Sequence, residues 1–185
     1  MAITTDPTSE NYNKFTEFPN LSYNCITYLI DNNELIWKLL KYNDSTAWSK
    51  TNLTKSEKQA LIYSGQPDET NYRVFLDIGQ DNSWNEQTSI LRISPITLIP
   101  SNHIVGEVYM GFEIYVHYKC NHLSNYQIRT DLIAQQIIEV FNGAEIGGLG
   151  RLYFDARASR SCKASIMGQI PYKGMNVIMC NHLVG

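Results

Sequence analysis

The tetrapeptide CNHL occurs twice in the chain, at residues 120–123 and again at residues 180–183. In each copy a cysteine and a histidine stand two residues apart, which places both side chains on the same side of an extended strand. Thiolate and imidazole are zinc ligands, and two neighbouring strands could complete a tetrahedral set. Its members would be Cys120, His122, Cys180 and His182.

Structural zinc sites usually draw on short knuckles of the C-x(2–4)-C kind, and neither copy has that spacing. Cys120 continues the apolar face that runs from Val108 to Tyr118, and Cys180 follows an apolar run, which is where a free buried cysteine is common. We therefore interpret both copies as strand ends, and we predict that the chain holds no metal and no cofactor. A small metal-binding enzyme that uses these four residues is the alternative.

No other motif for catalysis stands out. The glycine-rich stretch GAEIGGLG follows an expected helix and precedes an expected strand. A phosphate-binding loop has the opposite order, strand before helix, and ends in Lys-Ser or Lys-Thr. A G-x-S-x-G nucleophile elbow is also missing from the sequence. These observations predict a protein that is not an enzyme.

A basic segment, RLYFDARASRSCK, spans residues 151–163 and contains a single acid, Asp155. Small residues separate its cations, so the sequence predicts a loop between the last two strands. Such a loop could contact DNA phosphates or the acidic half of a neighbouring copy, or it could be an ordinary solvated loop. The residues concerned are Arg157, Arg160 and Lys163, with Arg151 before them.

Helical periodicity dominates the first part of the chain. Apolar residues recur at helical spacing over residues 20–42, with a break expected at Asp31-Asn32-Asn33 and a cap at Asn20 or Ser22. The sequence Thr54-Lys55-Ser56-Glu57 fits a capping box at the start of another helix.

Alternation of period two then predicts strands at residues 72–77, 90–99 and 107–120. Pro95 interrupts the second of these, which indicates a sheet edge or a bulge. In the third, one face from Val108 to Tyr118 is apolar and predicts the core. The opposite face is rich in tyrosine and predicts a contact surface with other copies; it carries Tyr109, Tyr115 and His117.

An amphipathic helix is expected over residues 124–141, with Gly143 as its C-terminal glycine, followed by strands at 151–154 and 172–180. The predicted fold class is α+β: a mainly antiparallel sheet packed by one amphipathic helix, with an N-terminal helical extension. The predicted organisation is an extended arm over residues 1–19, a helical segment over 20–66 and an α+β domain over 67–185. Phe15 and Phe18 in the arm are expected to dock on a neighbouring copy.

Composition narrows the function classes. The formal net charge of −3 argues against a dedicated nucleic-acid-binding protein. Residues 1–90 have a balance of −5 and residues 91–185 a balance of +2, which would suit a front-to-back contact between copies. Twelve tyrosines among only 18% charged residues favour a surface that contacts protein. No signal peptide and no membrane-spanning helix are expected.

The second half resembles the tail-terminator and neck proteins of tailed bacteriophages. The segments that carry the resemblance are ISPITLIP, EVYMGFEIYVHY, RTDLIAQQIIEVF, RLYF and GMNVIM, in this order. The helical front end, NLSYNCITYLIDNNELIWKLLKYND, is similar to virion proteins of large phages, including crAss-like ones.

This resemblance implies a structural virion protein of the head–tail neck, made in the bacterial cytoplasm. It would form a ring of six or twelve copies around the DNA channel and would join the portal or connector to the tail. Packaged DNA would be a non-specific contact, and a membrane would not be a partner. A head-completion or tail-hub component on the same fold is the alternative.

Overall fold

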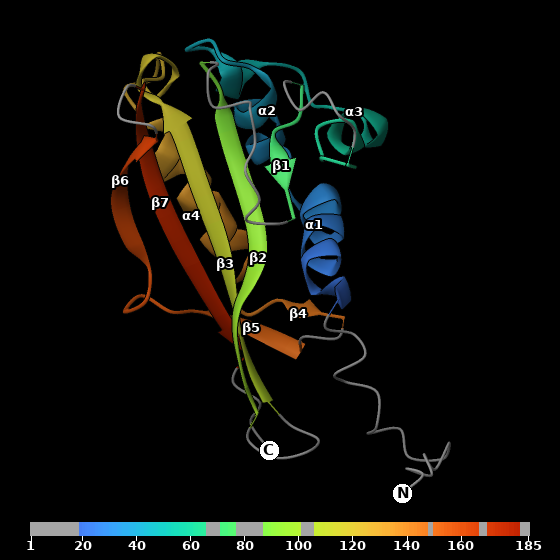
Figure 1. Cartoon of the computed structure of the whole chain (residues 1–185). Coiled ribbons are helices and arrows are strands. Elements are labelled where there is room, and N and C mark those ends of the chain that lie inside the picture. The colour runs from blue at the N-terminus through green and yellow to red at the C-terminus, as the bar shows by residue number, and fades with distance from the viewer. Residues whose placement is uncertain are drawn as a thin grey trace, which may run out of the picture.

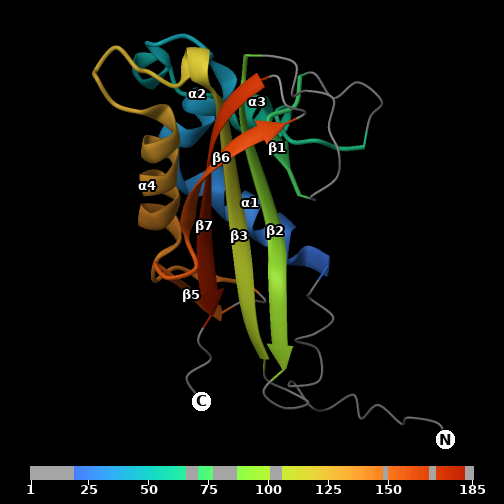
Figure 2. The same cartoon turned by 60° about the vertical axis from the view of Figure 1, so that its left-hand side comes forward.

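The computed structural model describes residues 19–65, 71–76, 87–100, 106–147, 150–166 and 170–181. Helices cover one face of a curled sheet (Figure 1, Figure 2). The helices are α1 (Leu21–Asn32), α2 (Leu35–Lys41), α3 (Lys55–Gln59) and α4 (Arg129–Phe141), with 3-10 turns at Ala47–Ser49 and Tyr118–Cys120. The strands are β1 (Val74–Phe75), β2 (Ser89–Pro100), β3 (Gly106–His117), β4 (Glu145–Ile146), β5 (Gly150–Phe154), β6 (Arg160–Ile166) and β7 (Ile170–Asn181).

The strand order across the sheet is β1-β2-β3-β7-β5-β4, and β6 also pairs with β7. Among the strand pairs of the described residues, the short β1–β2 pair is the parallel one and the others are antiparallel. The predicted α+β class with a mainly antiparallel sheet is therefore confirmed. The N-terminal helices α1 and α2 pack on the same sheet as α4.

β5 and β6 share one edge of β7, end to end. β5 pairs with residues 179–181 of β7, and β6 pairs with residues 170–176. The prediction of a loop across the basic segment is therefore wrong for Arg160 and Lys163, which belong to β6. Only the turn around Arg157 interrupts the edge, with the Asp155 carboxylate accepting the Arg157 backbone N–H at 2.9 Å. The small residues of β6 hide its alternation in the sequence, and pairing with β7 provides the hydrogen bonds that define it as a strand.

The long strand β3 has the predicted two faces. Its inner side chains are fully or almost fully buried and face the helices; they are Val108, Met110, Phe112, Ile114 and Val116. Tyr118 was predicted to continue this face, but it is 50% exposed. The reason is that the strand ends at His117, whose Nδ1 accepts the Lys119 N–H and begins a 3-10 turn.

β2 contains the irregularity that Pro95 predicted. The register with β3 shifts between Pro95 and Thr97, which identifies a bulge at Ile96. The side chain of Ile96 lies over Gly111 of β3, where a Cβ atom would come within 2.5 Å of the Ile96 Cδ1. Glycine at 111 is therefore what allows the bulged isoleucine to lie against the sheet.

The helix ends follow the sequence in part. The break between α1 and α2 falls at Asn33 and Glu34, close to the expected position, and the Asn33 side chain accepts the Ile36 N–H at 2.8 Å. The capping box at Thr54 and Glu57 is confirmed. Of the two predicted caps, Asn20 occupies the N-cap position of α1 but its side chain makes no capping hydrogen bond, and Ser22 lies within the helix.

The last helix is shorter than predicted at its N-terminal end. α4 begins at Arg129 rather than near Ser124, because an antiparallel bridge joins His122 to Ile128 and holds the intervening residues in a turn. Gly143 has a φ of 84°, as expected for the glycine after a helix C-terminus.

One core joins the helices to the sheet. Its members include Leu29, Trp37, Ile93, Phe112, Phe141 and Met179. The predicted boundary at residues 66 and 67 lies outside the described residues, and the core continues from the helices before it into the strands after it.

Candidate functional site

The two CNHL copies lie at opposite ends of the sheet. Cys180 of β7 is opposite Tyr109 of β3, whereas Cys120 follows His117, which is opposite Tyr172. Tyr109 and His117 are separated by eight residues along β3, which at about 3.3 Å per residue is about 26 Å. Cys120 and Cys180 therefore cannot bind one metal ion.

His182 lies outside the described residues. Within the residues that the structure does describe, no three His, Cys, Asp or Glu side chains gather as metal ligands would. Cys120 and Cys180 are buried free thiols, and burial raises the pKa of both.

The asparagine of each copy accepts a hydrogen bond from a backbone amide. The Asn121 Oδ1 accepts the Thr130 N–H at 3.0 Å and the Thr130 hydroxyl at 2.8 Å, at the start of α4. The Asn181 Oδ1 accepts the Val108 N–H of β3. Both asparagines are buried. Each copy thus supplies an acceptor to a backbone amide that would otherwise be buried without a partner.

Two buried cations, which the sequence did not single out, hold the ends of the N-terminal helices. The Lys58 ammonium donates to Ile30 O at 2.7 Å and to the Glu34 carboxylate at 2.6 Å, after the last turn of α1. The Arg129 guanidinium donates to Leu39 O at 2.7 Å, near the end of α2. Cations are favourable at helix C-termini, where carbonyls have no partner within the helix.

Arg129 is fully buried, and the same guanidinium also donates to Tyr42 O and, at 2.6 Å, to Asp44 O. Burial is the main cause that lowers the pKa of Arg129. Its closest contacts are backbone carbonyls on the α2 side, and it also donates to the Ser89 hydroxyl of β2 at 3.5 Å, so the residue joins α4 to α2 and to the sheet. Its role in this arrangement is structural.

The outer sheet face, which lies opposite the helices, holds the predicted contact residues. Tyr109 and Tyr115 are half-buried, and the Tyr115 hydroxyl donates to the Glu113 carboxylate at 3.0 Å. The Arg92 guanidinium lies 5.7 Å from the centre of the Tyr115 ring, within cation–π range. These two tyrosines are on the predicted face and are partly covered by the chain itself.

His117 was also predicted to be open on this face, but it is only 5% exposed. Its ring packs edge-on against Tyr172 at 5.4 Å and lies 4.7 Å from the Tyr118 ring. Burial, with a smaller effect of Lys119, lowers the pKa of His117. The predicted position of His117 on the outer face is correct. The predicted exposure of its side chain is wrong, because Tyr172 of the neighbouring strand covers the ring.

Exposed apolar side chains gather at one end of the same face. Ile96 is 48% exposed, Ile99 is 46% exposed and Tyr153 is 37% exposed. The register aligns Thr97, Tyr109, Cys180 and Tyr153 across β2, β3, β7 and β5, so these side chains share one region of the face. We call Ile96, Ile99, Tyr109 and Tyr153 the outer apolar patch. The β2–β3 hairpin that carries most of it projects beyond the helices (Figure 1, Figure 2).

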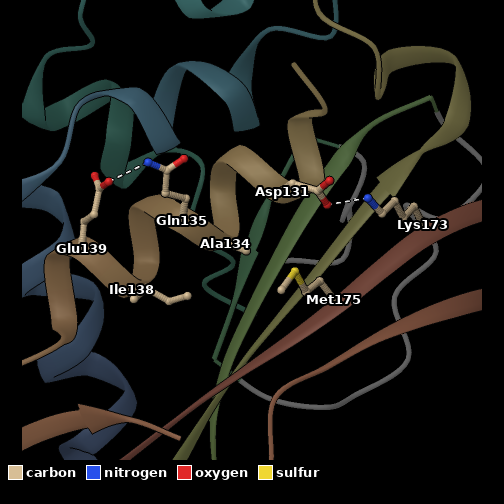
Figure 3. Close-up of a pocket in the computed structure, with 7 residues that line it drawn as sticks. All are labelled: Asp131, Ala134, Gln135, Ile138, Glu139, Lys173 and Met175. Atoms are coloured by element: carbon tan, nitrogen blue, oxygen red, sulfur yellow. Dashed lines mark hydrogen bonds and ion pairs between the residues drawn. The ribbon is translucent and has the colours of Figure 1, made fainter. Parts of the chain in front are cut away.

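A groove of about 640 Å³ lies on the opposite face, between α4 and β7 (Figure 3). Its apolar part comes from Ala134, Ile138 and Met175, and its polar rim from Asp131, Gln135, Glu139 and Lys173. Lys173 forms an ion pair with Asp131, and Gln135 donates to the Glu139 carboxylate at 2.7 Å. We call this the α4–β7 groove. The sequence analysis did not identify it, because Lys173 and Met175 lie more than thirty residues from α4 in the chain.

The remaining predicted residues are distributed as follows. Arg157 is exposed in the turn between β5 and β6. For Arg160 and Lys163 the structure describes the backbone in β6 and not the side chains. Phe15 and Phe18 lie outside the described residues.

Among the described residues, no helix is both long enough and apolar enough to cross a membrane. Comparison with known families matches residues 33–178, more than half of the chain, to the family described as YomW. No curated protein and no solved structure matches the chain.

Proposed function

Because the chain belongs to the phage-associated YomW family, we propose that it is a non-enzymatic structural protein of the phage particle, assembled as a ring at the head–tail neck. The ring would surround the DNA channel and join the portal or connector to the tail. The family match supports the phage origin. The position in the neck rests on the order of elements and on the surfaces described above.

The observation that carries the proposal is the outer apolar patch on the projecting β2–β3 hairpin. Exposed apolar side chains grouped in one region, with tyrosine among them, are typical of protein contact surfaces. Ile96 and Ile99 lie on a two-stranded extension that adds little to the core, so their exposure is better explained by contact with another chain. The hairpin would then place the patch against a neighbouring copy.

Light scattering coupled to size exclusion tests this proposal. We expect the full chain to form a discrete ring of six or twelve copies at high concentration or when mixed with the purified connector. Ile99→Ser should weaken that assembly, whereas Tyr126→Asn should not. Tyr126 is a matched control because it is 98% exposed on another surface and has a φ of 65°, which asparagine tolerates.

A strict monomer at high concentration, and also in the presence of the connector, would overturn the ring. Cryo-electron microscopy of intact particles would then place the chain. A location at the head vertex or at the tail hub, instead of the neck ring, would favour the head-completion or tail-hub alternative.

The turn around Arg157, between β5 and β6, provides a second contact surface within the same proposal. Arg157 is exposed beside Asp155, so it is available to DNA phosphates in the channel or to the acidic half of a neighbour.

A further inference from the structure

We propose that the α4–β7 groove binds the N-terminal arm of the adjacent copy, with Phe15 and Phe18 inserted against its apolar part. This inference rests on the proposed ring and names the contact that would link one copy to the next.

The groove has the character of a binding site for an aromatic anchor. Its volume of about 640 Å³ falls in the range of about 300–1,000 Å³ that is usual for ligand pockets. Ile138 and Met175 are half-buried at its apolar part, so both still have surface to cover. Methionine adapts its shape to aromatic partners and makes favourable sulfur–ring contacts.

The arm offers a matching pair of side chains. Phe15 and Phe18 are three residues apart, and residues at this spacing lie on one side of either an α-helix or a polyproline II segment. Lys14 precedes the pair and Glu17 lies between its two members, so these charges balance and the two phenylalanines carry the match to the groove.

The arm leaves the fold on the side away from the groove. α1 packs on β2, whereas α4 packs on β3 and β7, so the two helices lie over different halves of the sheet (Figure 2). The Asn33 side chain, after α1, donates to Gln136 of α4 at 2.9 Å. This contact places α1 and α2 on the Gln136 side of α4, and the groove is on the other side, lined by Asp131 and Ile138 (Figure 3).

The short reach of the arm favours the groove of another copy over its own. Phe15 is four residues before Pro19, and four extended residues span at most about 14 Å. A path around α4 alone would follow half the circumference of a helix with its side chains, which is about 17 Å.

A second copy removes this difficulty. A head-to-tail ring joins two different surfaces of the same chain, so the surface from which the arm leaves can face the α4–β7 groove of the next copy. The arm then leaves one copy next to the groove of its neighbour. The short reach then makes the contact specific, since it restricts the arm to the adjacent copy.

Photo-crosslinking of the full chain tests this inference. A benzoylphenylalanine at position 15 is introduced into unlabelled protein, which is mixed with nitrogen-15-labelled wild-type chain, assembled and irradiated. We expect mass spectrometry to find crosslinks between the two isotopes, from position 15 to peptides of α4 or of β7 around Met175. Crosslinks within one copy, or to any other surface of the neighbour such as the β2–β3 hairpin, would overturn the inference.

Affinity measurements complete the test. The double variant Phe15→Ser and Phe18→Ser should weaken assembly by about tenfold or more, as expected for the loss of aromatic anchors. Tyr12→Ser, which removes an aromatic residue from the same arm, should have little effect. Ile138→Asp in the groove should weaken assembly like the double variant, whereas Tyr126→Asp on another exposed surface should not.

The outcomes separate this inference from the proposed ring. If a ring forms and keeps its affinity in the double phenylalanine variant, the arm contact is wrong and the ring remains. If wild-type protein forms no ring even with the connector, both are wrong. Ile138→Asp is interpreted only after circular dichroism shows that the variant is folded, and the crosslinking result is independent of that variant.

Discussion

Replacing Arg129 should destabilise the whole chain through the carbonyls that it leaves unpartnered. Its guanidinium donates to Leu39 O, Tyr42 O and Asp44 O, and the side chain is fully buried. Each buried acceptor without a donor costs about 1–3 kcal/mol, so the three carbonyls together give a loss of about 3–9 kcal/mol. Water can reach Tyr42 and Asp44 after truncation, and the cost of burying the cation itself disappears, so the lower end of this range applies.

We therefore expect Arg129→Ala to lower the free energy of unfolding by about 4 kcal/mol, near the lower end of this range. Arg129→Lys should lie between this variant and the wild type, since an ammonium keeps the charge but cannot span three separated carbonyls. Urea titration followed by circular dichroism measures the free energies. Arg157→Ala, at an exposed arginine, is the control and should change the value by less than about 0.5 kcal/mol.

Hydrogen exchange adds a local test of the same reasoning. The amides of α2 should gain more exchange in Arg129→Ala than those in the middle of β3, because the short contacts of the guanidinium lie around the end of α2 and its 3.5 Å contact with the sheet is at Ser89 of β2. A loss below about 1 kcal/mol, or uniform exchange across both elements, would show that the buried cation contributes nothing specific to α2.

Two further predictions concern stability. Burial lowers the pKa of His117 from 6.5, so the unfolded chain takes up the proton first and stability should fall as the pH drops below 6.5. Urea midpoints measured against pH should show this slope in the wild type and lose it in His117→Phe. The control His122→Gln, at an exposed histidine, should keep the slope. Asn121→Ala and Asn181→Ala should each cost about 1–3 kcal/mol in the same titration, because each leaves a buried backbone amide without an acceptor; an unchanged midpoint in both would remove the shared role of the two CNHL copies.

Local periodicity predicted much of the fold because it depends on neighbouring residues alone. The alternation from Val108 to Val116, the bulge at Pro95 and the capping box at Thr54 each follow from a few adjacent positions. β6 was missed because its small and basic residues carry no apolar alternation, and only its pairing with β7 makes it a strand.

The tertiary contacts could not be predicted in the same way. In the sequence, Arg129 is an ordinary residue at the start of a helix. Its structural role depends on carbonyls far earlier in the chain, such as Leu39 O, which is 90 residues away. His117 was expected to be exposed because the residue that covers it, Tyr172, comes from a strand far along the chain. The α4–β7 groove likewise exists only once α4 and β7 are packed together.

The free edge of β2 restricts how copies can assemble. β1 pairs only with Leu91 and Arg92, so within the described residues the rest of β2 has no partner strand on that side. This edge carries Pro95 and a bulge, features that hinder the addition of another strand. A ring built by continuing the sheet from copy to copy is therefore disfavoured. Contacts through the outer apolar patch and the α4–β7 groove avoid this edge, because they use side chains on the two faces of the sheet.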